Sequence, residues 1–182
     1  MLKNGYLASS SADTTVKIWN IEDGSLQTTL TGHTGGVWSL VVLNNGDLAS
    51  SSVDKTINIW DVDSGRVKQT LTGHDGCINK LILLNNGDLV SGSDDKTIKI
   101  WNLKDGTVKM ILAGHKKFVF ALKQLKNGDL VSGSYDGKIK IWDVETGKVK
   151  KDLHISSGIN YFEVLKNGDL VSASNESIII WQ

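Results

Sequence analysis

The sequence predicts an all-β protein assembled from a repeated unit of about 41 residues that contains four short strands. Two landmarks carry this prediction. The Gly-His pairs at Gly32-His33, Gly73-His74 and Gly114-His115 follow one another at intervals of 41 residues. Tryptophans recur at intervals of 41, 41, 41 and 39 residues, at Trp19, Trp60, Trp101, Trp142 and Trp181. No segment shows a helical pattern of useful length, which leaves strands and turns.

Each strand of the unit has its own signal. The segment VWSLVVL is β-branched and aliphatic, and Asn45-Gly46 after it is a hairpin signal that gives both residues easy positive φ. DLASSS follows, then a polar turn with Asp54, then TINIW with two-residue alternation. The turn DVDSG leads into the last strand. We expect strands at 37–43, 47–52, 56–60 and 66–74, and their counterparts in the other repeats.

The period, the four strands and the Gly-His…Trp-Asp pattern resemble the WD40-repeat family along the whole chain. Trp60-Asp61 and Trp142-Asp143 match the family dipeptide, whereas Asn20 and Asn102 follow the other early tryptophans. The chain has no proline, so Asn-Gly stands where the family's turn usually has one. The resemblance implies a β-propeller of four-stranded blades.

At this period the chain holds about four and a half blades in one domain, 1–182. Three strands of a first blade, three whole blades and three strands of a fifth give 18 strands. We expect blades at about 1–31 (partial), 32–72, 73–113, 114–153 and 154–182 (partial). A seven-bladed ring needs about 290 residues, so the chain does not close one alone. The first strand is expected to be an exposed edge. Either the chain is part of a longer propeller, or two copies complete a ring as a homodimer.

Histidine, serine and aspartate are the components of a hydrolase triad, but here the set occurs three times and each copy is followed by a tryptophan. An active site occurs once, so a structural role is expected. The resemblance implies a buried hydrogen-bond network in each blade. The three sets are His33, Ser50, Asp54, Trp60; His74, Ser91, Asp95, Trp101; and His115, Ser132, Asp136, Trp142.

The terminal repeats keep only parts of this set. The first has Ser9, Asp13 and Trp19 but begins after the position of its histidine. The last has Ser172 and Trp181, with Asn-Glu in place of the aspartate. We therefore expect the last blade to be the most loosely packed.

Residues that vary between otherwise matching repeats are the candidates for binding. They are the second residue of each inner strand and the residue before the repeated aspartate, positions that in WD40 proteins surround the central channel. Phe118, which precedes an inner strand, is a further aromatic candidate near the same rim. Phe118 and Phe120 share one strand face under two-residue alternation, so packing between blades is the alternative for them, as it is for Trp38. An apolar slot beside Asp94 is expected to receive a lysine or arginine side chain of a partner. The candidates are Trp38, Asn79, Asp94, Phe118, Phe120, Tyr135 and Asn160.

The composition of the chain limits its expected partners, location and cofactors. The formal net charge is +0, and the lysines between 104 and 151 are interspersed with acids, so neither nucleic acid nor an anionic membrane is an expected partner. Cys77 is the single cysteine, which predicts a reducing, cytoplasmic location without an internal disulfide. Histidines in separate blades are too far apart to share a metal, and no cofactor is expected.

These observations predict a non-catalytic scaffold for protein–protein interaction that presents a propeller rim to a peptide or protein partner. An enzyme is not expected, because no unrepeated cluster of His, Asp, Glu or Cys occurs. The alternatives are a piece of a larger propeller without independent activity, and self-assembly into a larger dimeric ring.

Overall fold

The computed structural model describes residues 2, 5–155 and 157–181; the ends of the predicted domain, Met1 and Gln182, lie outside this range. The described residues form 18 strands in five antiparallel sheets and contain no helix, which confirms the all-β prediction and the strand count. The two terminal sheets have three strands each: β1 (Leu7–Ser10), β2 (Val16–Trp19), β3 (Leu26–Leu30) and β16 (Ile159–Val164), β17 (Leu170–Ser174), β18 (Ile178–Trp181).

The three central sheets have four strands each, and their order in space follows their order in the chain. They are β4 (Val37–Val42), β5 (Leu48–Ser52), β6 (Ile57–Asp61), β7 (Arg66–Leu71); β8 (Ile78–Leu83), β9 (Leu89–Ser93), β10 (Thr97–Trp101), β11 (Val108–Ala113); and β12 (Val119–Gln124), β13 (Leu130–Ser134), β14 (Lys138–Trp142), β15 (Val149–His154).

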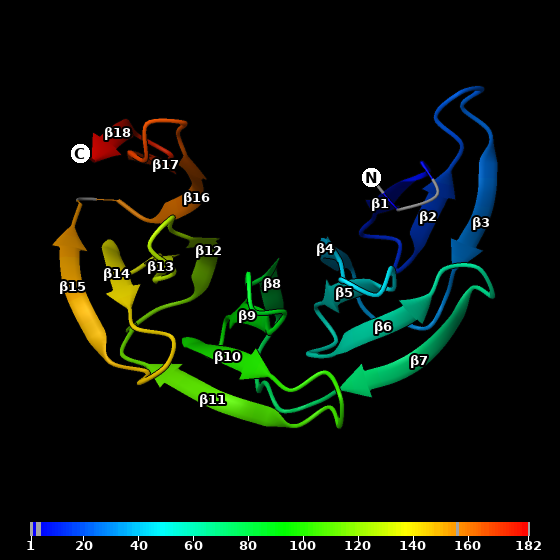
Figure 1. The fold of residues 1–182 in the computed structure, drawn as a ribbon, viewed down its shortest axis with the longest axis horizontal. Helices are drawn as coiled ribbons and strands as arrows, with labels where there is room; N and C mark the ends of the chain where they lie inside the picture. The colour runs from blue at the N-terminus through cyan, green and yellow to red at the C-terminus, as the bar shows by residue number, and fades with distance from the viewer. Residues whose placement is uncertain (1, 3–4, 156, 182) are drawn as a thin grey trace.

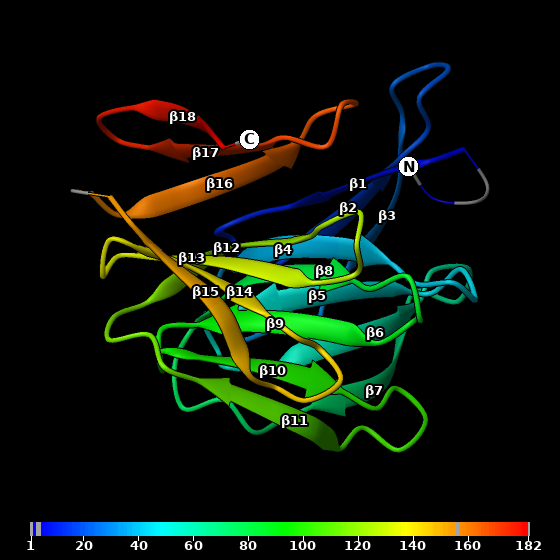
Figure 2. The ribbon, with the colours of Figure 1, turned by 60° about the vertical axis from the view of Figure 1, so that its left-hand side comes forward.

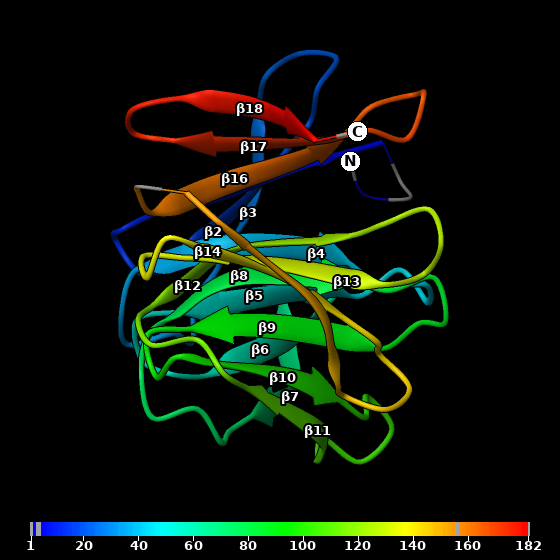
Figure 3. The same ribbon diagram turned by 90° about the vertical axis from the view of Figure 1, so that its left-hand side faces the viewer.

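The sheets are the blades of an open arc. Figure 1 shows β4, β8, β12 and β16 on the inside of the arc and β3, β7, β11 and β15 on the outside, with a gap between the first and last sheets. Figures 2 and 3 show the arc from the side, with the connecting loops gathered on two opposite faces. Because neighbouring strands are antiparallel, the β3–β4, β7–β8 and β11–β12 connections share one face with the β5–β6, β9–β10 and β13–β14 turns.

The Asn-Gly turns differ from the prediction in one respect. Gly46 has a φ of 97°, but Asn45 is absent from the residues with positive φ. Gly46 donates to the Leu43 carbonyl at 2.9 Å and Leu43 donates to the Asp47 carbonyl at 2.8 Å, so the loop has three residues and only its last residue is left-handed. The expectation of positive φ at both residues is therefore wrong. The side-chain oxygen of Asn45 accepts the Asp47 amide at 3.1 Å, which stabilises this turn.

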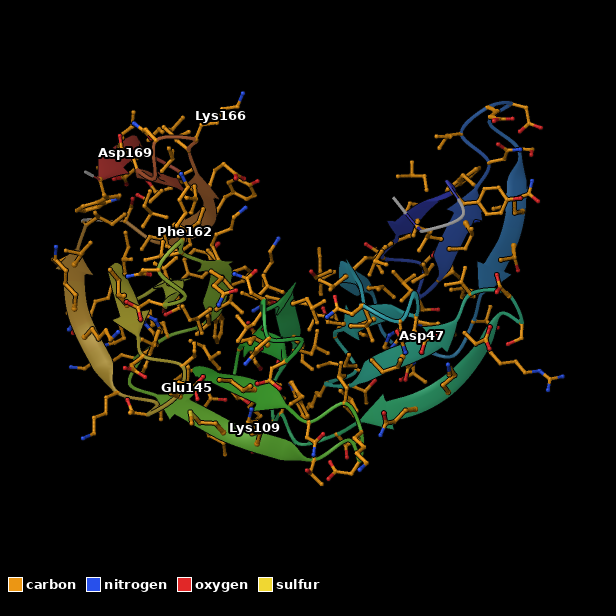
Figure 4. The ribbon with its side chains drawn as sticks, viewed as in Figure 1. Asp47, Lys109, Glu145, Phe162, Lys166 and Asp169 are labelled. Carbon is orange, nitrogen blue, oxygen red and sulfur yellow. The ribbon has the colours of Figure 1, made fainter. Side chains whose placement is uncertain are left out.

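The core lies between blades. In the first interface, Val16 and Ile18 of β2 pack against Val37, Leu48 and Trp60 of the next blade. The next two interfaces follow the same rule: aliphatic residues from the third strand of one blade meet the tryptophan of the following blade. In the last one, Phe162 on β16 is buried with the aliphatic residues of β13 and β14, toward which it points in Figure 4.

The two ends of the arc lack this cover. Ile178 is 74 % exposed, whereas Ile57, its counterpart in the second blade, is fully buried. Ile180 on the same strand face is 57 % exposed. At the other end Leu7 is 46 % exposed, whereas its counterpart Leu48 is 1 % exposed. One end therefore presents a bare isoleucine face, and the other presents the kind of face that such isoleucines cover inside the arc.

Candidate functional site

The predicted set of four residues in the second blade forms one continuous hydrogen-bond chain. The Trp60 indole N–H donates to Ser50 Oγ at 2.7 Å, and Ser50 Oγ lies 2.7 Å from His33 Nε2. His33 Nδ1 lies 2.8 Å from Asp54. The Asp54 carboxylate only accepts, which assigns the ring proton to Nδ1. Nε2 of the neutral ring then accepts from the Ser50 hydroxyl, whose oxygen accepts from the indole. We call this arrangement a tetrad.

The third and fourth blades repeat the tetrad. Their tryptophan-to-serine distances are 2.8 and 2.7 Å, and both serine-to-histidine distances are 2.7 Å. The Nδ1–carboxylate distances are 2.6 Å for His74–Asp95 and 3.1 Å for His115–Asp136. The serines are fully buried, and two partners engage each hydroxyl, so a substrate has no access to them. This geometry locks the loops of a blade to its strands.

Burial and hydrogen bonding both shift the pKa values of tetrad residues. Burial opposes ionisation of Asp95, but hydrogen bonds from His74 and Thr97 outweigh it and lower the pKa of Asp95 far below its usual value. Burial also lowers the pKa of His115, although the nearby Asp136 carboxylate opposes that shift. The fourth blade therefore pairs an ionised aspartate, whose pKa is also lowered, with a neutral histidine.

The terminal blades keep only the tryptophan–serine bond. Trp19 donates to Ser9 at 2.8 Å and Trp181 donates to Ser172 at 2.9 Å. In the first blade, Asp13 accepts from the Thr15 amide and hydroxyl, at 3.0 and 2.7 Å. Both tryptophans are only half-buried, because each terminal blade lacks part of its surroundings.

The variable position of the inner strands has a structural basis that the sequence did not reveal. In each of the four, the pairing register shifts between the first and third residues, so the second residue bulges out of the ladder. A β-bulge redirects a side chain. The four bulged residues are Trp38, Asn79, Phe120 and Asn160. All lie near the start of their strands, on the side of the arc that carries the tetrad loops, which we call the tetrad face.

Three of the predicted binding residues form one aromatic cluster on the tetrad face. The Phe120 and Tyr135 rings lie 4.7 Å apart between centroids in an edge-to-face arrangement, and the Phe118 and Phe120 rings lie 6.5 Å apart. Phe118 is 44 % exposed and Tyr135 is 39 % exposed. Phe118 precedes β12 and Phe120 is bulged, so two-residue alternation does not describe their directions.

The other candidates lie apart from this cluster or have partners of their own. Trp38 is 58 % exposed and makes no ring contact among the described residues. The Asn79 side chain donates to Asp94 at 2.8 Å and to the Val119 carbonyl of the next blade at 3.1 Å, so Asp94 already has a donor within the chain. The Asn160 side chain donates to Asn175 at 2.6 Å.

Lysines beside the aromatic cluster are a feature that sequence reasoning missed. Lys96, Lys116 and Lys117 line a hollow together with Phe118 and Tyr135. The signal in the sequence was the departure from the repeat: Lys116-Lys117 stand where the second and third blades have Thr-Gly and Asp-Gly. Within the described part of the chain, no three His, Cys, Asp or Glu side chains are placed to hold a metal ion. None of the described segments is a helix with the length and apolar character to cross a membrane.

Comparison with known proteins matches the family model "WD domain, G-beta repeat" to residues 3–20, 24–61, 65–102 and 105–143. A protein of Arabidopsis thaliana described as "Non-functional target of rapamycin complex subunit LST8-2" is 54% identical over 35 residues, 19% of this chain and 11% of that protein. The crystal structure of the WD40 beta propeller domain of Doa1 has a TM-score of 0.87 at 32% identity. That match covers 97% of this chain and 60% of the solved chain, so this chain spans less than two thirds of either relative. The repeat model matches well over half of the residues, and the chain belongs to the WD40-repeat family.

Proposed function

We propose that this chain is a non-catalytic interaction scaffold that presents the rim of its tetrad face to a peptide or protein partner. The exposed aromatic cluster on the tetrad face carries the proposal. Aromatic anchors dominate the energetics of protein interfaces, and here they occupy positions that vary while the surrounding repeat does not. The tetrads supply the rigid loops that such a surface needs.

Membership of the WD40-repeat family supports the proposal, because these propellers generally bind protein partners. The name of the Arabidopsis relative describes that protein as a non-functional complex subunit, and the match covers only 35 residues. Likeness of fold does not identify a partner, so the proposal rests on the exposed side chains of this chain.

A displayed library of random peptides, panned on the immobilised chain, tests the proposal. Phe118→Ala removes a half-exposed ring of the cluster. Ile111→Ala is the control, because Ile111 is 53 % exposed on the outer strand β11 and is not part of the aromatic cluster. We expect enriched peptides to bind the Phe118→Ala protein at least about tenfold more weakly than wild type, as for an anchor residue. The control should bind like wild type. Enriched peptides that bind the Phe118→Ala protein as tightly as wild type would refute a rim site at this cluster.

The bare ends of the arc favour a second property. We propose that further WD40 blades cover both ends in the complete ring. The support is continuity with the interfaces inside the chain, where every isoleucine face meets the tryptophan face of the next blade. Ile178 and Ile180 present the first kind of face, and Leu7 presents the second.

The molar mass measured by light scattering over a concentration series tests whether a second copy of the chain or additional polypeptide supplies these blades. A mass that rises above the 19.8 kDa of one chain, and that falls back in an Ile178→Ser, Ile180→Ser variant, identifies a second copy as the source. A monomer whose stability rises when further blades are fused to it identifies additional polypeptide. A chain that stays monomeric and whose stability does not rise when further blades are fused to it would contradict the proposal.

A further inference from the structure

The hollow beside the aromatic cluster combines an apolar floor with positive charge. It encloses about 390 Å³ and is lined by Phe118, Tyr135, Lys96, Lys116 and Lys117, without a carboxylate among its lining residues. The three lysines are exposed, and none of them forms a salt bridge with another described residue. This charge is therefore free to meet a ligand.

Several lysines on the fourth strands of the blades pair with acids instead. Lys68 bonds Asp47 at 2.8 Å, and Lys109 bonds Asp88 at 2.7 Å. Figure 4 shows Lys109 on the outer strand β11, away from the inside of the arc. Lys150 follows the same pattern with Asp129 at 2.6 Å. These pairs hold a fourth strand to the turn of its own blade, whereas the three lysines of the hollow have no acid partner among the described residues.

The loop that carries two of these lysines departs from the packing of its counterparts. A Cβ at Gly35 would lie 2.9 Å from the backbone nitrogen of Asp54, and one at Gly76 would lie 2.6 Å from that of Asp95. The second and third blades thus use glycine because the loop touches the turn closely. The fourth blade has Lys117 at this position, and its loop must make room for a side chain.

One distance of the fourth tetrad is longer than its counterparts. His115 Nδ1 lies 3.1 Å from the Asp136 carboxylate, compared with 2.8 Å for His33 and Asp54 and 2.6 Å for His74 and Asp95. A sequence that breaks a local packing rule without a structural gain points to a functional position. The lysines and the neighbouring Phe118 are therefore the part of the tetrad face most specialised for binding.

We propose that this hollow binds a peptide segment that inserts one apolar or aromatic side chain between Phe118 and Tyr135 and sets acidic side chains against Lys96, Lys116 and Lys117. The proposal rests on the proposed function and names the chemistry of its partner. Contact between the inserted side chain and the rings of Phe118 and Tyr135 supplies most of the affinity. Each exposed ion pair adds up to about fivefold, and the contribution falls with salt. Single-stranded nucleic acid also binds through aromatic rings and lysines. The formal net charge of +0 gives the chain no overall field to recruit it, so we favour a peptide.

The test compares three proteins against the same displayed library of random peptides: wild type, the double variant Lys116→Glu, Lys117→Glu, and the control Lys104→Glu. Lys104 is exposed, lies in the turn after β10 on the face opposite the tetrads, and forms no salt bridge among the described residues. Peptides enriched on wild type and on the control should carry aspartate or glutamate beside an aromatic or aliphatic residue. The double variant should lose that preference and bind the wild-type peptides at least about tenfold more weakly.

Two further measurements separate the outcomes. Affinity of the best acidic peptide should fall severalfold when salt rises from about 0.05 to about 0.3 M, and more than tenfold when its apolar residue becomes alanine. Binders that depend on Phe118 but carry no acidic residues would overturn this inference and leave the proposed function standing. Library peptides that never depend on Phe118 would overturn both. Equal competition by a short oligothymidylate would show a general anion surface and refute the peptide proposal.

Discussion

Replacing Ser50 with alanine removes the hydroxyl that two buried partners share. Ser50 Oγ accepts from the Trp60 indole and lies within hydrogen-bond distance of His33 Nε2, both at 2.7 Å. Its neighbour Ser51 is equally buried, but Ser51 Oγ has no hydrogen-bond partner among the described residues. Comparing alanine substitutions at the two adjacent serines therefore separates the effect of breaking the hydrogen-bond network from the effect of removing a buried hydroxyl.

The magnitudes follow from what each change leaves behind. Ser50→Ala strands one donor and one acceptor, each costing about 1–3 kcal/mol when buried without a partner, so the free energy of unfolding should fall by about 2–6 kcal/mol. Ser51→Ala deletes an unsatisfied hydroxyl and should range from no effect to a gain of about 1 kcal/mol. Ala173 occupies the corresponding place in the last blade, so alanine fits there.

Urea unfolding followed by tryptophan fluorescence measures both variants. We expect the midpoint of Ser50→Ala to drop clearly and that of Ser51→Ala to stay at or above wild type, with similar slopes. Equal destabilisation by the two changes would refute the hydrogen-bond account of the tetrad, because it would show that burial volume alone decides the outcome.

Further predictions concern pH, the partial tetrad and the tight loop. The lowered pKa of His115 means that its stabilising contribution is complete above the unfolded value of about 6.5 and is lost as pH falls below it; His115→Gln should therefore flatten the decline in unfolding free energy between about pH 7.5 and 5.5, and an unchanged decline would contradict this. Ser9→Ala strands only the half-buried Trp19 indole and should cost about 1 kcal/mol by urea unfolding; a loss as large as that of a complete tetrad would argue against the network. Gly76→Ala places a Cβ 2.6 Å from the Asp95 amide and should cost about 1–3 kcal/mol by the same assay, whereas a neutral result would show that the loop yields freely.

Much of the candidate site was predictable because it is periodic. The tetrad residues recur at fixed intervals, and a serine, an aspartate and a tryptophan that lie within one hairpin have little freedom in where they meet. The directions of the rim side chains were not predictable in this way. Two-residue alternation places Phe118 and Phe120 on one strand face, but a bulge interrupts the alternation at the second of them. That bulge arises from pairing between strands and has no signature in a single strand.

The sequence by itself determined the strand number, the order of the blades and the incomplete first and last repeats, since each depends on local patterns repeated along the chain. Only the tertiary structure decided which lysines lack an acid, which aromatic rings touch, and that Ile178 is bare while Ile57 is covered. These properties depend on neighbours from other strands and blades. Nearly identical repeats carry the same side chains, but a residue is buried or available according to whether another blade packs against it.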